Sequence, residues 1–377
     1  MRTYFIAPTR PSVGLTSVSL GLVRALQRQG LKVAYVKPVT KTTPQTEPSA
    51  LFVRSICGVD SPDPLPMDDV TQYLTAGRMD ELLERLVGMA MAASDDADVL
   101  LVEGLHPDPA HAYIPRLSGE LAISLQADVV LVASAADAQG IAEVKDLVAL
   151  VRNSRRRVVG VIFNKAAASF DEARASAELG DVPVWGVIRA DPRLSAPRTL
   201  DLAQHLGAEV LVAGEIASRR VHERSATAVI PRLRPGALIV SAGDRDDVML
   251  ATALAASNGI KLAGLVLTHD SYISPRIEKL AAQAFRGGLP ILRTGGDSFE
   301  TAARISRMPS AVAHDDTERM ETVIEAIAEQ LDGDAICAGL EQRATPRLSS
   351  PAFRYQLIRR ARAADKRIVL PEGDEPR

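Results

Sequence analysis

The ten residues from 8 to 17, PTRPSVGLTS, constrain the fold more than any other stretch of this sequence. They follow a short apolar run at 4–7, and apolar residues then recur at helical spacing between positions 18 and 26, which predicts strand, loop and helix in that order. The first N–H groups of a helix are unpaired and its dipole favours an anion, so a glycine and two hydroxyls at this point suit a phosphate. Gly14, Thr16 and Ser17 are therefore candidate phosphate-binding residues.

The position after Gly14 departs from the usual phosphate-binding loop. In that pattern a glycine is followed by lysine and then Ser or Thr, whereas Leu15 stands here in the place of the lysine. The substitution removes the cation that reaches the outer phosphates and leaves backbone donors and hydroxyls. We interpret the loop as a nucleotide-type site without its catalytic charge. The alternative is an ordinary strand-to-helix turn capped by Ser12.

Composition narrows the class of protein and of partner. A chain of 377 residues has room for two or three domains. Its net charge of -3 gives no electrostatic reason to expect a nucleic acid or an anionic membrane as partner. The two cysteines, Cys57 and Cys337, do not make a disulfide framework, and the histidines show no metal-ligand spacing. No signal peptide precedes the first predicted strand and no apolar run reaches spanning length, so the predicted location is the cytoplasm.

Strands and helices alternate through residues 1–208, which predicts a doubly wound α/β domain with a parallel sheet. Its strands are expected at 4–7, 31–36, 98–102, 129–133, 158–163 and 184–188. Ligands of such sheets bind outside the carboxyl ends of the strands. Lys37, Glu103 and Asn164 each follow the end of a predicted strand and are candidate site residues. A carboxylate such as Glu103 is a ligand type that Mg²⁺ accepts, and Asn164 with Lys165 suits the base or ribose edge of a nucleotide.

The second half of the chain predicts a smaller α/β domain and the beginning of another. Residues 209–332 carry strands expected at 210–212, 237–240, 262–268 and 290–292, and helices at 248–257, 277–285 and 317–331. Residues 333–351 are expected to form a linker. A basic helix at 352–364 and a strand at 366–370 follow, and a strand needs a neighbour to pair its backbone groups. Residues 352–377 are therefore interpreted as the start of a further domain.

The sequence resembles the long-form bacterial phosphate acetyltransferases over essentially its whole length. The resemblance rests on SSPAFRYQL at 349–357, KRIVLPEGDEPR at 366–377 and SVGLTSVSLG at 12–21. The first domain of that family is in turn similar to dethiobiotin synthetases, a P-loop NTPase type, and Lys37-Pro38-Val39 and Val102-Glu103-Gly104 match them. The middle unit resembles the DRTGG domain, since Asp244-Arg245 fits its signature, whereas Thr268-His269-Asp270 replaces the Thr-Gly-Gly in this interpretation.

This resemblance implies a role for the chain. Members of the family convert acetyl-CoA and phosphate into acetyl phosphate and CoA, with catalytic and CoA-binding residues in a C-terminal domain that lies beyond this sequence. It also implies regulation by small-molecule metabolites and assembly into a homo-oligomer, a hexamer in the family. We therefore expect a regulatory region of acetate metabolism without catalytic residues or a metal site of its own, whose CoA contacts belong to the absent domain.

Three other functions are compatible with the sequence. An ATP-dependent ligase of the dethiobiotin synthetase kind would use Thr16, Lys37 and Glu103. A nucleotide sensor, with ATP or NADH as the regulatory ligand, would hold it without turnover through residues Gly14, Thr16, Ser17, Lys37, Glu103 and Asn164. A module that only braces an oligomer would need no ligand at all.

Overall fold

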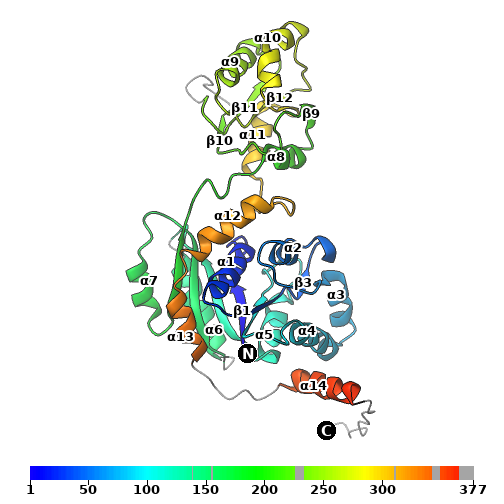
Figure 1. The fold of residues 1–377 in the computed structure, drawn as a ribbon, viewed down its shortest axis with the longest axis vertical. Coiled ribbons are helices and arrows are strands. Elements are labelled where there is room, and N and C mark those ends of the chain that lie inside the picture. Colours follow the sequence, from blue (N-terminus) through cyan, green and yellow to red (C-terminus); the bar gives the residue numbers. More distant parts are fainter. Residues whose placement is uncertain (138, 154–155, 226–232, 310, 342–348, 365–377) are drawn as a thin grey trace. The chain divides into compact units, whose positions relative to one another are not determined.

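The computed structural model describes residues 1–137, 139–153, 156–225, 233–309, 311–341 and 349–364, and the chain divides into two compact units (Figure 1). Unit 1 combines residues 1–190 with the chain from 314 onward, and unit 2 comprises residues 191–313. Each unit is built around a sheet of its own.

Six parallel strands form the sheet of unit 1, in the order β2-β5-β1-β6-β7-β8. They are β1 (Arg2–Pro8), β2 (Val33–Val36), β5 (Val99–Glu103), β6 (Asp128–Ser134), β7 (Val158–Ala166) and β8 (Val184–Arg189), and a separate pair is formed by β3 (Val39–Thr40) and β4 (Leu65–Pro66). The order reverses at β1, which lies between β5 and β6. The predicted doubly wound sheet is confirmed, and the loop after β1 opens at the switch point where such sheets bind ligands.

Helices cover both faces of this sheet (Figure 1). The helices of unit 1 are α1 (Leu15–Arg28), η1 (Pro44–Thr46), α2 (Pro48–Ser55), α3 (Met67–Thr75), α4 (Met79–Ala93), α5 (Ile114–Ser124), α6 (Gln139–Asn153), α7 (Glu172–Leu179), α12 (Thr317–Ala328), α13 (Gly333–Glu341) and α14 (Ser350–Ala363), of which α14 packs on α4 and α5. One face packs its apolar side chains against α4, α5, α6 and α7. α1 packs against α12, and a Cβ on Gly21 would lie 2.3 Å from the Ile327 side chain, so glycine is what lets these two helices approach.

Unit 2 has a smaller mixed sheet in the order β10-β11-β12-β13-β9, in which β9 is the antiparallel edge. Its elements are α8 (Thr199–Leu206), β9 (Glu209–Val212), β10 (Glu223–Ser225), β11 (Ala237–Ala242), α9 (Asp246–Ser257), β12 (Gly264–Thr268), α10 (Pro275–Arg286), β13 (Ile291–Arg293) and α11 (Ser298–Ser306). The predicted smaller α/β region is therefore present. β10 and α11 were not predicted.

The compact units do not divide where the sequence boundaries were placed, at 208 and 332. α8 belongs to unit 2, where the Thr199 hydroxyl donates to the Ala263 carbonyl at 2.8 Å. The helix expected at 317–331 is α12, which packs on α1 of unit 1. The segment 40–48 contains the end of β3, η1 and the start of α2. The predicted strand at 366–370 lies outside the described residues, as do residues 342–348 of the predicted linker. The linker prediction is wrong for residues 333–341, which form α13.

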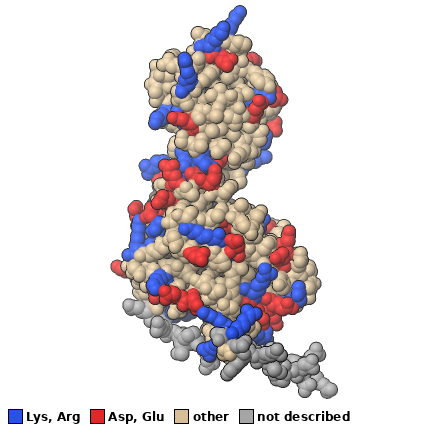
Figure 2. Space-filling view, turned by 45° about the vertical axis from the view of Figure 1, so that its right-hand side comes forward, with Lys and Arg blue, Asp and Glu red and all other residues tan. Residues whose placement is uncertain are grey.

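The surface carries charges of both signs. Figure 2 shows Lys and Arg side chains interspersed with Asp and Glu over the visible face, without a broad area of one sign. None of the described helices has the length and apolar character needed to span a bilayer.

Candidate functional site

The loop between β1 and α1 lies at the carboxyl edge of the unit 1 sheet. Gly14 is the N-cap residue of α1 and adopts a left-handed backbone with φ 84°, a conformation that glycine takes without strain. No side chain caps this helix, so Ser12 does not play the capping role of the alternative interpretation. The N–H groups of the first turn are available to an anion, as expected for a helix N-terminus.

Leu15 cannot act as a polar contact at this loop. It is the first residue of α1 and only 1% exposed, within the apolar core. Ser17 lies in the same first turn and is half-buried. The loop therefore offers backbone donors and small hydroxyls, without a cation at the position where phosphate-binding loops carry lysine.

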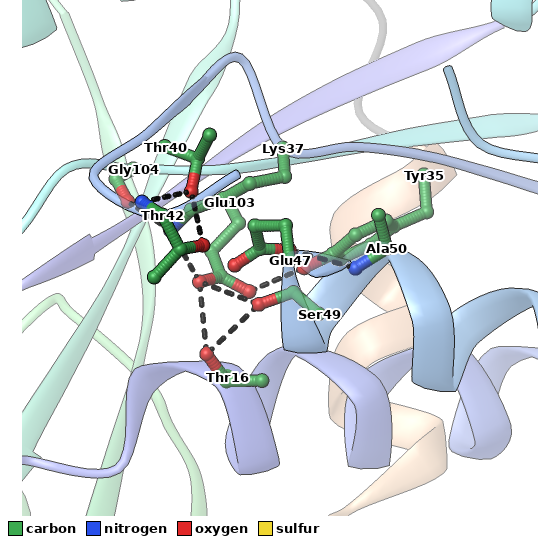
Figure 3. Close-up of polar contacts among 10 residues, drawn as sticks. All are labelled: Thr16, Tyr35, Lys37, Thr40, Thr42, Glu47, Ser49, Ala50, Glu103 and Gly104. Atoms are coloured by element: carbon green, nitrogen blue, oxygen red, sulfur yellow. Dashed lines mark hydrogen bonds and ion pairs between the residues drawn. The ribbon is translucent and has the colours of Figure 1, made fainter. Parts of the chain in front are cut away.

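A buried carboxylate next to the loop is the centre of a polar network (Figure 3). Glu103, at the end of β5, is fully buried and pairs with Lys37, whose Nζ lies 2.6 Å from Glu103 Oε1. The hydroxyls of Thr16 and Ser49 donate to the same oxygen at 3.0 and 3.3 Å. Tyr35 donates to Glu103 Oε2. The carboxylate of β5 thus receives hydrogen bonds from α1, β2 and α2 and an ion pair from the loop that follows β2.

The environment keeps this carboxylate ionised. Burial raises the pKa of Glu103, but attraction to Lys37 and hydrogen bonds from Lys37 and Tyr35 outweigh it and hold the pKa below its usual range. Burial and the neighbouring charge of Glu103 raise the pKa of Tyr35 well above its usual range, so the phenol remains a donor. Lys37 and Glu103 therefore neutralise each other's charge, and the hydrogen bonds around them form a buried polar network next to the loop.

Two residues at the end of β7 hold the opposite side of the loop. Asn164 Nδ2 donates to the Val13 carbonyl at 2.8 Å, and Lys165 Nζ donates to the Ser12 carbonyl at 2.8 Å. A Cβ on Gly14 would lie 2.4 Å from Asn164 Nδ2, so the loop can approach β7 this closely only with glycine there.

Two further cations of unit 1, Arg10 and Lys41, are paired with carboxylates. Arg10 pairs with Asp137 at 2.8 Å and with Glu143 at 3.3 Å. Lys41 pairs with Asp108 at 2.6 Å. In the part of the chain that the structure describes, no group of three or more His, Cys, Asp or Glu side chains is arranged to hold a metal ion.

The structure brings the predicted site residues to one edge of the sheet in two groups. Thr16, Lys37 and Glu103 share the buried network, while Gly14 and Asn164 meet at the other side of the loop. Whether they bind a nucleotide stays a prediction. Sequence reasoning missed Tyr35 and Ser49. For Tyr35 a signal existed, because it lies two residues before Lys37 and alternation along an extended chain places both on one face.

The Thr-Gly-Gly part of the signature has two candidate turns in unit 2. Thr268-His269-Asp270 is predicted to replace the Thr-Gly-Gly, although the chain also has a Thr-Gly-Gly at 294–296, directly after β13. The two segments lie side by side, since the His269 and Asp270 amides donate to the Gly296 and Thr294 carbonyls at 3.0 and 3.1 Å. In the Asp244-Arg245 part of the signature, Arg245 forms an ion pair with Asp247, with an N–O distance of 2.8 Å.

The lowered pKa of Glu103 makes unit 1 sensitive to acid. A carboxyl group with a folded-state pKa below its unfolded value, about 4.3 for glutamate, contributes stability above that value and loses it as the pH falls through the folded-state pKa. We expect the difference in unfolding free energy between the wild type and the double variant Lys37→Met/Glu103→Gln to narrow as the pH is lowered from 7 to 3. Urea unfolding titrations between pH 7 and pH 3 measure this difference in free energy. A difference that stays constant would mean that the folded-state pKa of Glu103 is not lowered.

Comparison with known proteins links both units to described domains. The profile of the AAA domain matches residues 2–198, and that of the DRTGG domain matches residues 201–308. The MinD cell division protein of Aquifex aeolicus superposes with a TM-score of 0.36 at 15% identity, covering 52% of this chain and 84% of that chain. Phosphate acetyltransferase from Deinococcus radiodurans is 41% identical over 401 residues, and that from Pseudomonas aeruginosa is 41% identical over 409. Each alignment covers 100% of this chain and 57% of the relative, so the chain spans little more than half the length of these proteins.

Proposed function

This chain belongs to the AAA domain family and, with its DRTGG domain, matches the N-terminal part of phosphate acetyltransferases, and from that premise we propose that it is a regulatory region that holds a nucleotide-type ligand without turning it over. The acyl transfer between acetyl-CoA and phosphate, with its CoA contacts, then belongs to the part of those relatives that this chain does not span. Assembly into a homo-oligomer is part of the same proposal.

One observation carries the proposal: Lys37 is bound to Glu103 at 2.6 Å while Leu15 takes the place of the loop lysine. Phosphoryl transfer depends on cations and donors aimed at the charge that develops on the transferring group. Here the cation next to the first turn of α1 is neutralised by a buried carboxylate. Backbone N–H groups and the Gly14 turn still suit a phosphate. This arrangement favours binding over catalysis, and therefore a sensor over an ATP-dependent ligase.

Nucleotide binding is expected to raise the melting temperature of the chain. A ligand that binds only the folded form adds about 2.7 kcal/mol at a concentration of 100 times its Kd. Thermal-shift titrations with ATP, ADP and NADH measure this, and the same samples are assayed for phosphate release and for acetyl phosphate formation from acetyl-CoA and phosphate.

The proposal predicts a shift for at least one nucleotide with no turnover in either assay. Release of phosphate from ATP that disappears in a Glu103→Gln variant would favour the ligase instead. Absence of a shift with all three nucleotides would favour a module that only braces an oligomer, which sedimentation of the same chain would then reveal.

A further inference from the structure

Phosphate-binding loops of this pattern hold their ligand together with Mg²⁺, which is coordinated by the hydroxyl at the position of Thr16. The residues of this chain do not fit that cation. We propose that the ammonium of Lys37 occupies the place of the divalent cation, so that the site takes its phosphate ligand in the metal-free form. The inference deepens the proposed function and rests on it, because it specifies the chemical form of the ligand.

The carboxylate that contacts Thr16 has no oxygen left for a metal ion. Glu103 Oε1 accepts from Lys37 Nζ at 2.6 Å, from Thr16 at 3.0 Å and from Ser49 at 3.3 Å. Its Oε2 accepts from the Tyr35 phenol. An ionised carboxylate offers about four lone-pair sites in all. The donors of the network therefore use the whole acceptor capacity of Glu103.

The surroundings of Thr16 have the dimensions of a hydrogen-bond network. Its Oγ1 lies 3.0 Å from both Glu103 Oε1 and Ser49 Oγ, which are ordinary hydrogen-bond lengths. Mg²⁺ requires oxygen ligands at about 2.0–2.1 Å and keeps several of its waters. Glu103 is 0% exposed and Lys37 is 7% exposed, so the carboxylate has no contact with solvent through which such waters could be retained.

Electrostatics oppose a second cation at this carboxylate. A divalent ion on Glu103 would lie within a few ångströms of the Lys37 ammonium, where like charges repel strongly in a buried environment. Burial raises the pKa of Glu103, but attraction to Lys37 and hydrogen bonds from Lys37 and Tyr35 outweigh it. The ammonium thus already provides the compensation that a metal ion would bring.

The neighbouring carboxylate does not complete a metal site. Glu47 lies in the same region as Glu103 (Figure 3), but its Oε2 accepts from the Ala50 amide at 2.8 Å as the cap of α2. Among the described residues, no three His, Cys, Asp or Glu side chains could hold a metal ion together. The charge of the ligand is then met by the backbone N–H groups of α1, without a bridging cation.

The first arm of the test measures binding of Mn²⁺, a paramagnetic substitute for Mg²⁺, by electron paramagnetic resonance. We expect no binding to the wild type at millimolar Mn²⁺. The variant Lys37→Ala leaves the buried carboxylate without its counter-ion and opens space beside Thr16, so it should bind Mn²⁺ at least about 10-fold more tightly than the wild type. Thermal unfolding shows that the variant is folded, and Mn²⁺ should raise the melting temperature of Lys37→Ala but not that of the wild type.

Two variants control this arm. Lys37→Met/Glu103→Gln removes the carboxylate charge together with the ammonium and should bind no Mn²⁺. Lys41→Ala frees Asp108 from an exposed ion pair, and one exposed carboxylate does not make a metal site, so no gain in Mn²⁺ affinity is expected.

The second arm uses the wild type alone and does not depend on the folding of a variant. Isothermal titration calorimetry measures the affinity for inorganic pyrophosphate in EDTA and in excess Mg²⁺. The affinity in EDTA should equal or exceed that in Mg²⁺, because the magnesium complex carries less negative charge to the first turn of α1.

The outcomes separate this inference from the proposed function. Mn²⁺ binding to the wild type, or a folded Lys37→Ala that gains no affinity for Mn²⁺, would show that Lys37 does not occupy the cation position. Loss of more than about tenfold in pyrophosphate affinity in EDTA would show that the site needs a metal, as ordinary loops of this pattern do. If the wild type binds neither pyrophosphate nor a nucleotide under either condition, the proposed function fails, and the Mn²⁺ arm still decides the role of Lys37.

Discussion

Replacing Lys37 with methionine is expected to lower the free energy of unfolding by about 3–5 kcal/mol, the usual cost of removing one partner from a buried ion pair. Glu103 is 0% exposed and would lose the ammonium that lies 2.6 Å from it. The hydroxyls of Thr16, Tyr35 and Ser49 donate to the carboxylate but carry no compensating charge. Urea unfolding of the wild type and the variant at pH 7 measures the loss.

Two further variants show whether the loss comes from the buried charge. Lys41→Met removes an exposed lysine that pairs with Asp108, so it should change stability little. The double variant Lys37→Met/Glu103→Gln removes both charges and should recover part of the loss. The destabilisation of Lys37→Met should also shrink as the pH falls, because protonation neutralises the stranded carboxylate. Equal stability of Lys37→Met and wild type would mean that Glu103 is not charged in the folded protein.

Most of the unit 1 sheet could be predicted because its strands are apolar without alternation. β5 is buried along its whole length, as is typical of a parallel strand covered on both faces. The rule that ligands bind at the carboxyl edge of such sheets then indicated Lys37 and Glu103 together. That they would pair with each other could not be predicted, because the pairing depends on the side-chain geometry of two strands that are distant in sequence.

For α2 and α12 the sequence signal is compatible with more than one structure. Proline is typical of loops, but it is also favoured in the first turn of a helix. Pro48 begins α2, and Glu47 caps that helix by accepting from the Ala50 amide at 2.8 Å. α12 was predicted from its apolar spacing and assigned to the wrong unit. Periodicity specifies which face of a helix is buried, but not which sheet or helix buries it.

Replacement of Gly14, the N-cap residue of α1, is expected to have the second large effect on the free energy of unfolding. Gly14→Ala is expected to cost about 1–2 kcal/mol for a left-handed backbone at φ 84° and a further 1–3 kcal/mol for overpacking. The new Cβ would lie 2.4 Å from Asn164 Nδ2. That amide is buried and donates to the Val13 carbonyl, so it cannot move away without releasing the loop.

The variant Gly30→Ala separates the backbone cost from the overpacking cost, because Gly30 has a similar φ of 78° and a Cβ there meets nothing within 4 Å. Urea unfolding should show the backbone cost alone for Gly30→Ala and the larger sum for Gly14→Ala, and calorimetry should show weaker pyrophosphate binding for Gly14→Ala alone. Both effects follow from one displacement, since an alanine that pushes the loop away from β7 also moves the first turn of α1, whose unpaired N–H groups would meet the anion. Equal costs and equal binding in the two variants would mean that the loop is not held against β7, and the site would then lack the geometry on which anion recognition depends.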